Sequence, residues 1–442
     1  MTTRRQLLQQ ASAGFGYLAF ADMASAESKL NSHFPAKAKR VIFLCMRGGP
    51  SHMETFDPKP ELTRRHGEPG RHKGTKLLGS RWKFSRHGQS GIDIVELFPE
   101  LAKQADKLCV LRGMHTDNEN HPQALEQLHT GSFQFVRPSM GAWTVYGLGS
   151  ENENLPGFIS INPLTALGGL RYYSSAFLPA SNSATLLGNA NQPGTKLQLG
   201  NITNPRLDNA AKREQLDLLQ AMNHDLFAQT GDPRVEGIIS SYELAFHMQG
   251  ELPRVMDLSG ESKETLQLYG ADKAPTETFG RQCLLARRFA EAGVRFIEIS
   301  HQEWDLHGSL QSGMTRNCGQ IDKPIAGLLQ DLDQRGLLED TLILWGGEFG
   351  RTPDDATQDG RGHNNKGYSM WMAGGGVKGG HIHGATDDLG IEAVDGKVHI
   401  HDLHATMLHL LGLDHEQLTF RYGGRDFRLT DVHGKVVKAI LA

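Results

Sequence analysis

Two short apolar segments, each running into a loop of carboxylate and imidazole groups, constrain the fold of this chain more than any other feature. Residues 296–300 precede the loop H-Q-E-W-D-L-H-G, and residues 341–345 precede G-G-E-F-G-R-T-P. Between them, residues 321–335 carry apolar side chains at helical spacing. A strand, a helix and a strand in this order predict a right-handed parallel crossover, and the loops at the carboxyl ends of such strands form a ligand crevice.

The rest of the chain extends the same architecture. Apolar runs predict strands at 41–46, 107–111, 155–161 and 368–373, and helical spacing predicts helices at 122–130, 279–292 and 402–411. Residues 162–205 lack periodicity, 206–249 are typical of helix and 250–276 of a polar connector, so we expect an insertion at 162–276. We predict one α/β domain over residues 27–442, with a mostly parallel sheet sandwiched by helices.

The first 26 residues have the features of an export signal. T-R-R-Q-L-L is a twin-arginine pattern, a weakly apolar stretch follows it, and A-S-A offers a cleavage site. An ordinary amphipathic amino terminus is the alternative interpretation. The signal predicts passage through the twin-arginine translocase and a periplasmic or secreted mature protein.

Composition narrows the classes of partner. The formal net charge is −4 and there is no long basic run, so nucleic acid is not expected. No apolar run reaches the roughly 20 residues that span a bilayer, so no stable membrane span is expected. The cysteines lie far apart without C-x-x-C spacing, which favours buried free thiols over a disulfide framework.

The charged loops predict a metal site. Asp305 and His307 follow one strand, Glu348 follows the next, and His363 lies in the loop beyond it. Carboxylate oxygens and imidazole nitrogens of this kind hold a divalent cation when about three to five of them converge. Each has a simpler alternative: the first pair could form a hydrogen-bonded turn, the glutamate could be solvated, and the later histidine could be exposed.

Two further acids follow the first strand. Glu54 and Asp57 compete for one ligand position, and Asp57 could instead hold the turn before Pro58. The mixed oxygen and nitrogen set favours zinc, with manganese or iron as alternatives, over calcium. One ion would suit it, as would two ions that clamp the attacking and leaving oxygens of a displacement.

His121 and Arg351 are the candidate catalytic residues. His121 directly precedes Pro122, which suits the first position of the helix at 122–130. The helix dipole disfavours an imidazole cation there, which suits a neutral nucleophile or a metal ligand. A loop histidine bonded to backbone is the alternative. Arg351 or Lys366 would offset the negative charge of a substrate.

Longer motifs resemble those of one protein family. They include G-G-P-S-H-M-E-T-F-D-P-K-P, W-D-L-H-G, W-G-G-E-F-G-R-T-P and H-D-L-H-A-T-M-L-H-L-L-G-L-D-H, and they extend over nearly the whole mature chain. This pattern is similar to the family called domain of unknown function 1501. The resemblance implies twin-arginine export and an alkaline-phosphatase-like three-layer sandwich with loop insertions, within the alkaline phosphatase and sulfatase superfamily.

The resemblance also implies residue roles. The metal positions of the superfamily correspond to Glu348, to Asp305 with His307 at a shorter spacing, to His363, and to either Glu54 or Asp57. The pattern departs from the superfamily at Phe349, which replaces a metal histidine, and at Gly362, where relatives commonly have Asp. His121 stands where the superfamily has a nucleophilic Ser, Thr or formylglycine cysteine, and there is no C-x-P-S-R motif.

Two hypotheses follow. The first is an exported metal-dependent hydrolase of phosphate or sulfate esters, with sulfated or phosphorylated extracellular polysaccharide as one candidate substrate. The second is a non-catalytic protein that binds metal or glycan on a degenerate scaffold. The missing nucleophile favours the second hypothesis, and the retained acids and histidines favour the first.

Overall fold

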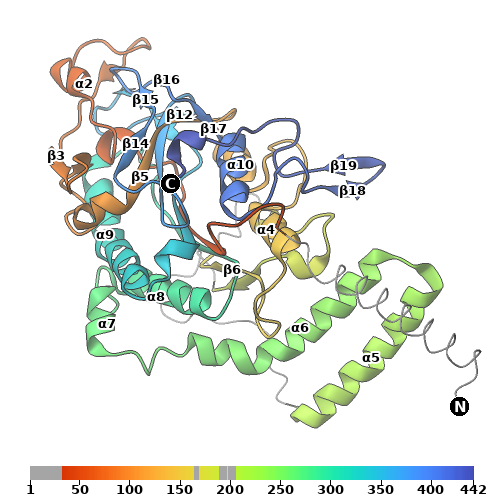
Figure 1. The fold of residues 1–442 in the computed structure, drawn as a ribbon. Helices are drawn as coiled ribbons and strands as arrows, with labels where there is room; N and C mark the ends of the chain where they lie inside the picture. Colours follow the sequence, from red (N-terminus) through yellow and green to blue (C-terminus); the bar gives the residue numbers. More distant parts are fainter. Residues whose placement is uncertain (1–31, 164–168, 189–196, 198–205) are drawn as a thin grey trace, which may run out of the picture.

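The fold is built on a central sheet. A computed structural model describes residues 32–163, 169–188, 197 and 206–442, and the signal predicted at residues 1–26 lies outside them. Within these residues a nine-stranded sheet has the order β14-β5-β13-β9-β1-β8-β6-β7, with β17 beside β5 (Figure 1). The strands are β14 (His381–His383), β5 (Leu108–His115), β13 (Tyr368–Ala373), β9 (Thr341–Gly346), β1 (Arg40–Met46), β8 (Phe296–His301), β6 (Phe158–Ile161), β7 (Thr185–Leu187) and β17 (Val398–His399).

The sheet is mostly parallel. β1 pairs in parallel with β8 on one side and with β9 on the other, so β1 lies between the two strands of the predicted crossover. Only β13 runs against its neighbours, pairing antiparallel with β5 and β9. The carboxyl ends of β1, β8 and β9 therefore meet at one edge.

Both faces of the sheet are covered, because successive side chains of β1 pack alternately into two hydrophobic clusters. Ile42 and Leu44 belong to one core cluster, and Val41 and Phe43 belong to another. The first cluster includes residues of α8 (Glu277–Glu291) and α9 (Leu310–Gln334). The second includes residues of α3 (His121–Thr130), α4 (Met140–Leu148) and α10 (Ile400–Leu410). This three-layer arrangement confirms the predicted fold class.

Small two-stranded sheets decorate the edges of the sandwich. They pair β2 (Lys76–Leu77) with β11 (Asp354–Asp355), β3 (Phe84–His87) with β4 (Ile92–Val95), β10 (Gly350–Arg351) with β12 (His363–Asn364), β15 (Ala385–Thr386) with β16 (Ala393–Asp395), and β18 (Phe420–Tyr422) with β19 (Arg425–Phe427). A short helix, α2 (Pro60–Arg64), follows the first strand's loop. The β10–β12 pair bears on function because it carries two of the candidate site residues.

Several predicted boundaries need correction. α9 begins at Leu310, eleven residues before the predicted start, because buried Leu310, Met314 and Cys318 continue its apolar stripe at a spacing of four. The region expected to be a connector contains the end of α6 (Pro233–Met256) and all of α7 (Lys263–Leu268). A 3-10 helix at Leu101–Lys107 precedes β5.

The predicted insertion is largely helical where it is described. α5 (Asn209–Thr230) begins at an Asp208 side-chain cap and ends at Gly231 in the left-handed conformation, and α6 then returns beside it. Figure 1 shows this hairpin reaching away from the sheet. Its separation as an insertion at 162–276 remains a prediction, and part of that range lies outside the described residues. None of the described helices combines the length and hydropathy needed to cross a bilayer.

Candidate metal centre

Side chains from distant parts of the chain converge at the carboxyl edge of the sheet. Asp305 and His307 lie in the loop after β8, and Glu348 lies two residues beyond β9. His363 is the first residue of β12, and His121 is the first residue of α3. The parallel strands and the helix start thus deliver groups that are up to 242 positions apart in sequence to one place, counting from residue 121 to residue 363.

One oxygen is the centre of this cluster. Asp305 Oδ1 lies 3.2 Å from His121 Nε2, 3.0 Å from His307 Nε2 and 3.3 Å from His363 Nε2. The Nε2 atoms of His307 and His363 are 2.9 Å apart. Donors held about 2.0–2.1 Å from a tetrahedral zinc ion lie roughly 3.3–3.4 Å from each other. The distances from Asp305 to the three imidazoles are close to that spacing, and the ligand atoms of His121, Asp305 and His363 all lie within 4.8 Å of one another.

Hydrogen bonds set the tautomers of two imidazoles. His363 Nδ1 lies 2.7 Å from the Glu119 carbonyl, which only accepts, so Nδ1 carries the proton and Nε2 presents a lone pair. His121 Nδ1 lies 2.6 Å from Glu348 Oε1, and that carboxylate also accepts the Gly48 N–H. Carboxylates and carbonyls orient metal-binding histidines in this way.

The cluster fits a bound cation better than a hydrogen-bond network. A carboxylate oxygen has about two lone pairs, yet three imidazole nitrogens and Arg351 Nη2, at 2.7 Å, surround Asp305 Oδ1. His121 Nε2 is buried and forms no hydrogen bond. An orphaned imidazole nitrogen beside a carboxylate suits a divalent metal, and His121, Asp305 and His363 are grouped closely enough to share one.

The charged groups of the cluster and their burial shift one another's pKa values. Burial alone would raise the pKa of Asp305, but His121, His363 and Arg351 hold it well below its usual range. Burial would lower the pKa of His121, but the carboxylates of Asp305 and Glu348 raise it to about 9. The two carboxylates thus outweigh the helix dipole that was expected to keep this imidazole neutral, and a bound metal ion would have to displace its proton. For His307 burial prevails and lowers the pKa, although Asp305 opposes it.

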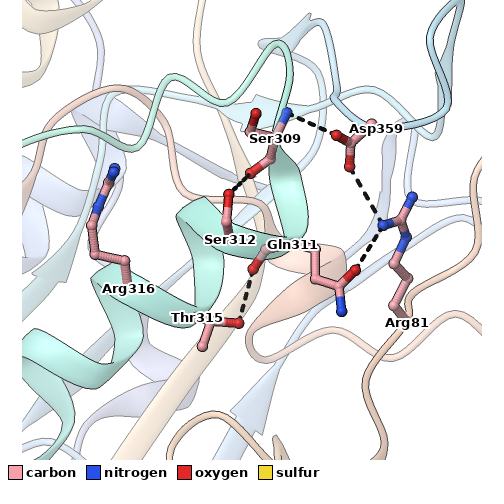
Figure 2. A pocket seen from close by; sticks show the side chains of 7 residues that line it. All are labelled: Arg81, Ser309, Gln311, Ser312, Thr315, Arg316 and Asp359. Atoms are coloured by element: carbon pink, nitrogen blue, oxygen red, sulfur yellow. Dashed lines mark hydrogen bonds and ion pairs between the residues drawn. The ribbon is translucent and has the colours of Figure 1, made fainter.

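The cluster is open to solvent on one side. The side chains of His307 and Asp305 are 54% and 43% exposed, whereas Glu348 is fully buried beneath them. A polar cleft of about 740 Å³ lies along the start of α9 (Figure 2). Ser309, two residues after His307, donates its backbone N–H to Asp359 in the cleft wall, 3.1 Å away. The same view shows Arg81 and Arg316 on opposite sides of α9.

Arg351 lies beneath the cluster and not in the open cleft. Its side chain is 2% exposed, Nε donates to the Gly49 carbonyl at 2.9 Å, and Nη1 donates to the Arg361 carbonyl at 3.2 Å. Nη2 donates to Asp305 Oδ1 and to the Gly48 carbonyl. These bonds leave Arg351 placed to fix the Asp305 carboxylate.

The two acids after β1 lie in separate ion pairs. Glu54 accepts two hydrogen bonds from Arg361, Nε to Oε2 at 2.8 Å and Nη2 to Oε1 at 2.5 Å, and both side chains are fully buried. Asp57 lies 2.9 Å from Lys59 Nζ and accepts the Thr386 hydroxyl at 2.5 Å. The structure thus brings neither acid to the Asp305 cluster.

Two neighbours of the cluster were not foreseen from the sequence. Arg361, two residues before His363, neutralises Glu54; a basic residue inside the G-R-G-H motif was the available signal. The Phe349 ring packs with its centroid 4.7 Å from the rings of both His121 and His363. It fills the side of the cluster where the resemblance expects a further histidine.

Comparisons with known proteins give one family match and several structural similarities of low sequence identity. The sequence profile described as "Protein of unknown function (DUF1501)" matches residues 38–441, and no curated protein sequence matches the chain. Among solved structures, the chain is similar to the PsFucS1 sulfatase from Pseudoalteromonas sp., with 11% identity, a TM-score of 0.41, and coverage of 92% of this chain and 72% of that one. It is also similar to the lipoteichoic acid synthase LtaP from Listeria monocytogenes (10%, 0.38, 92% and 77%). A third is the alkaline phosphatase from the Antarctic bacterium TAB5 (9%, 0.32, 77% and 92%).

Proposed function

The chain belongs to the family described as "Protein of unknown function (DUF1501)", and we propose that it is an exported, metal-dependent hydrolase of phosphate or sulfate esters. The observation that carries the proposal is the convergence of three imidazole nitrogens on Asp305 Oδ1, within 3.3 Å, at a solvent-open edge of the sheet. Zinc suits this donor set, with manganese or iron as alternatives. Export through the twin-arginine translocase to the periplasm or beyond is part of the same proposal.

His121, Asp305, His307 and His363 would hold the ion. When bound, it would supply the Lewis acidity that polarises an ester oxygen. Glu348 would hold the ring of His121 through Nδ1, and the Glu119 carbonyl would hold that of His363. Arg351 would fix Asp305 as a positioning residue, since its own nitrogens are engaged with backbone carbonyls.

Water is the candidate nucleophile. Both nitrogens of His121 face carboxylates, which favours a ligand role over nucleophilic attack by this imidazole. In the described part of the chain, no serine, threonine or cysteine side chain hydrogen-bonds to Asp305, His307 or His363. Solvent reaches the cluster on the side of His307, and an ester oriented there could be attacked directly.

The substrate would be anionic and could extend beyond the reacting group. The cleft shown in Figure 2 continues from Ser309 along the start of α9, with two arginines and several hydroxyl and amide groups along it. Such groups suit a sulfated or phosphorylated glycan, since guanidinium groups pair with sulfate and phosphate and hydroxyls bond to sugars.

A non-catalytic metal- or glycan-binding protein is the second candidate. Phe349 occupies one side of the cluster with an apolar ring, which leaves a single ligand sphere where two ions would need more donors. Glu54 and Asp57 are committed to Arg361 and Lys59. A site of this kind could recognise an anionic ligand without turning it over.

Metal analysis combined with ester turnover tests both candidates. Protein purified from a folded, exported preparation would be analysed for bound metal and assayed with 4-nitrophenyl phosphate and 4-nitrophenyl sulfate, with and without chelator. The Asp305→Ala variant should lose metal and turnover, and Asp333→Ala, an exposed carboxylate farther along α9, should lose neither. Metal without chelator-sensitive turnover would favour the binding protein, and a metal-free wild-type protein would refute the metal-dependent hydrolase and leave glycan binding alone.

A further inference from the structure

A second group of ligand-type side chains lies sealed in the core, apart from the open cluster. Cys45 of β1, His129 of α3 and Glu298 of β8 bring a thiol sulfur, an imidazole nitrogen and a carboxylate oxygen within 4.8 Å of one another. All three side chains are at most 1% exposed. His129 lies eight residues after His121 on α3, which corresponds to about 12 Å along the helix axis. One helix therefore carries a histidine of each group.

The contact between His129 and Glu298 lacks a proton in the ordinary charge states. His129 Nδ1 lies 2.8 Å from the Leu125 carbonyl, which only accepts, so Nδ1 carries the hydrogen. Nε2 then presents a lone pair to Glu298 Oε1 at 3.2 Å, and an ionised carboxylate also presents lone pairs. Two acceptors at this distance repel unless a positive charge lies between them.

In the described residues Arg47 supplies positive charge near Glu298, but no cation lies between the carboxylate and His129. Glu298 Oε2 is buried and has no hydrogen-bond partner. Arg47 lies nearby, but none of its three guanidinium nitrogens forms a hydrogen bond to the carboxylate. Besides His129, the Ser300 hydroxyl donates a hydrogen bond to Glu298 Oε1 at 3.3 Å. A buried carboxylate so poorly satisfied is costly, so something else is needed to balance it.

We propose that Cys45, His129 and Glu298 form a second metal site, which holds a thiophilic divalent cation such as zinc inside the fold. The cation would replace the missing proton between His129 Nε2 and Glu298 Oε1, and the sulfur of Cys45 would complete a set of three protein donors. Sulfur, nitrogen and oxygen together select zinc over magnesium or calcium.

The Cys45 sulfur distinguishes a bound metal ion from a proton shared between His129 and Glu298, because only the metal ion would bind all three side chains. Burial raises the pKa of the Cys45 thiol well above its usual range even though Arg47 opposes the rise, so a thiolate would form there only with a cation bound directly to the sulfur. On metal binding the thiol would release its proton to solvent, and thiolate and carboxylate together would balance the two positive charges of the ion. The site is closed to solvent, so the ion would enter during folding and leave slowly.

Cobalt substitution tests this site without reference to any activity. Protein from cells grown with cobalt would be analysed for metal content and for a thiolate-to-cobalt charge-transfer band in the near ultraviolet. We expect two ions per chain and a thiolate band. Brief dialysis against chelator should remove the ion of the open cluster, whose donors contain no sulfur, and leave the band.

Two cysteine variants provide the contrast. Cys45→Ser should lose the band and one ion, whereas Cys109→Ser, another buried thiol of the same core cluster, should keep both. If Cys45→Ser fails to fold, the wild-type spectrum still decides. A folded wild-type protein with no thiolate band would overturn the proposal and leave a shared proton between His129 and Glu298. Loss of the ion of the open cluster alone would bear only on the proposed hydrolase.

Discussion

Glu54 and Asp305 are carboxylates with similar predicted roles but opposite environments. Glu54 is fully buried and accepts a bidentate pair of hydrogen bonds from Arg361, which is also fully buried. Asp305 is 43% exposed, and its partners are three imidazoles and one nitrogen of Arg351. Arg361 and the Ser51 hydroxyl satisfy the Glu54 carboxylate. Asp305 Oδ1 has more neighbours than it has lone pairs to accept hydrogen bonds.

The difference teaches how to separate structural from ligand-binding acids. A bidentate arginine satisfies the lone pairs and the charge of a buried carboxylate, and such a pair holds two segments together. Imidazoles that are held by outer hydrogen bonds present lone pairs of their own, so an acid surrounded by them remains incomplete without a cation. Burial alone does not make the distinction, since Glu348 is as buried as Glu54 yet supports the open cluster.

Breaking the Glu54–Arg361 pair should cause the largest effect. Arg361→Met leaves Glu54 buried and unpaired, so we expect the free energy of unfolding to fall by about 3–5 kcal/mol. Urea unfolding followed by circular dichroism would measure it. Arg64→Met, which breaks the exposed Arg64–Glu61 pair, should leave the unfolding midpoint unchanged. A stable Arg361→Met protein would mean that Glu54 is neutralised by another group.

Metal removal should have the next largest effect, and it should depend on Asp305. An ion present at a thousand times its dissociation constant stabilises the folded state by about 4 kcal/mol, so chelator should lower the melting temperature of the wild type. Asp305→Asn should melt at the same temperature with and without chelator. The matched variant Asp333→Asn should respond to chelator as the wild type does. An unchanged chelator response in Asp305→Asn would place the stabilising ion elsewhere.

The sequence predicted the meeting place of the cluster better than its internal contacts. Strands that run parallel bring their following loops to one edge, which is why Asp305, His307 and His363 could be assigned to one site from topology alone. The pairing of Glu54 with Arg361 joins residues 307 positions apart, and no local pattern records it. The extra turns of α9 were missed because polar residues between Leu310 and Cys318 mask a sparse apolar stripe.

Glu348 lies between the two classes of acid, because it is fully buried like Glu54 but bonds to a histidine of the Asp305 cluster. If Glu348 orients His121 without binding the ion itself, Glu348→Gln should weaken metal affinity by about 10–100-fold, as removal of an outer hydrogen-bond partner does. Competition with a chromophoric chelator would measure the affinity. Glu339→Gln, an exposed glutamate just before the start of β9, is the control. Complete loss of metal in Glu348→Gln would instead favour direct ligation by Glu348.

Buried Glu54 keeps its charge because Arg361 pairs with it, whereas the buried His404 of α10 remains neutral. Burial lowers the pKa of His404 to about 3, and its Nε2 bonds to the Leu128 carbonyl at 2.8 Å. In the unfolded chain a histidine has a pKa of about 6.5. Between these two pKa values the unfolded chain therefore binds a proton at His404 and the folded chain does not. This contribution to stability is complete above about pH 6.5 and declines on acidification toward the folded pKa.

The pH dependence of stability that His404 causes is the smallest of these predicted effects. Between about pH 6 and pH 4 His404 should reduce the free energy of unfolding by about 1.4 kcal/mol for each pH unit lost. His404→Gln removes the titration, so its stability should fall less steeply with acid than that of the wild type. Urea midpoints at pH 8, 6 and 5 would measure this, with the pH 8 difference as the internal reference. Parallel curves would show that the folded and unfolded chains take up the His404 proton over the same pH range, so that burial does not lower its pKa.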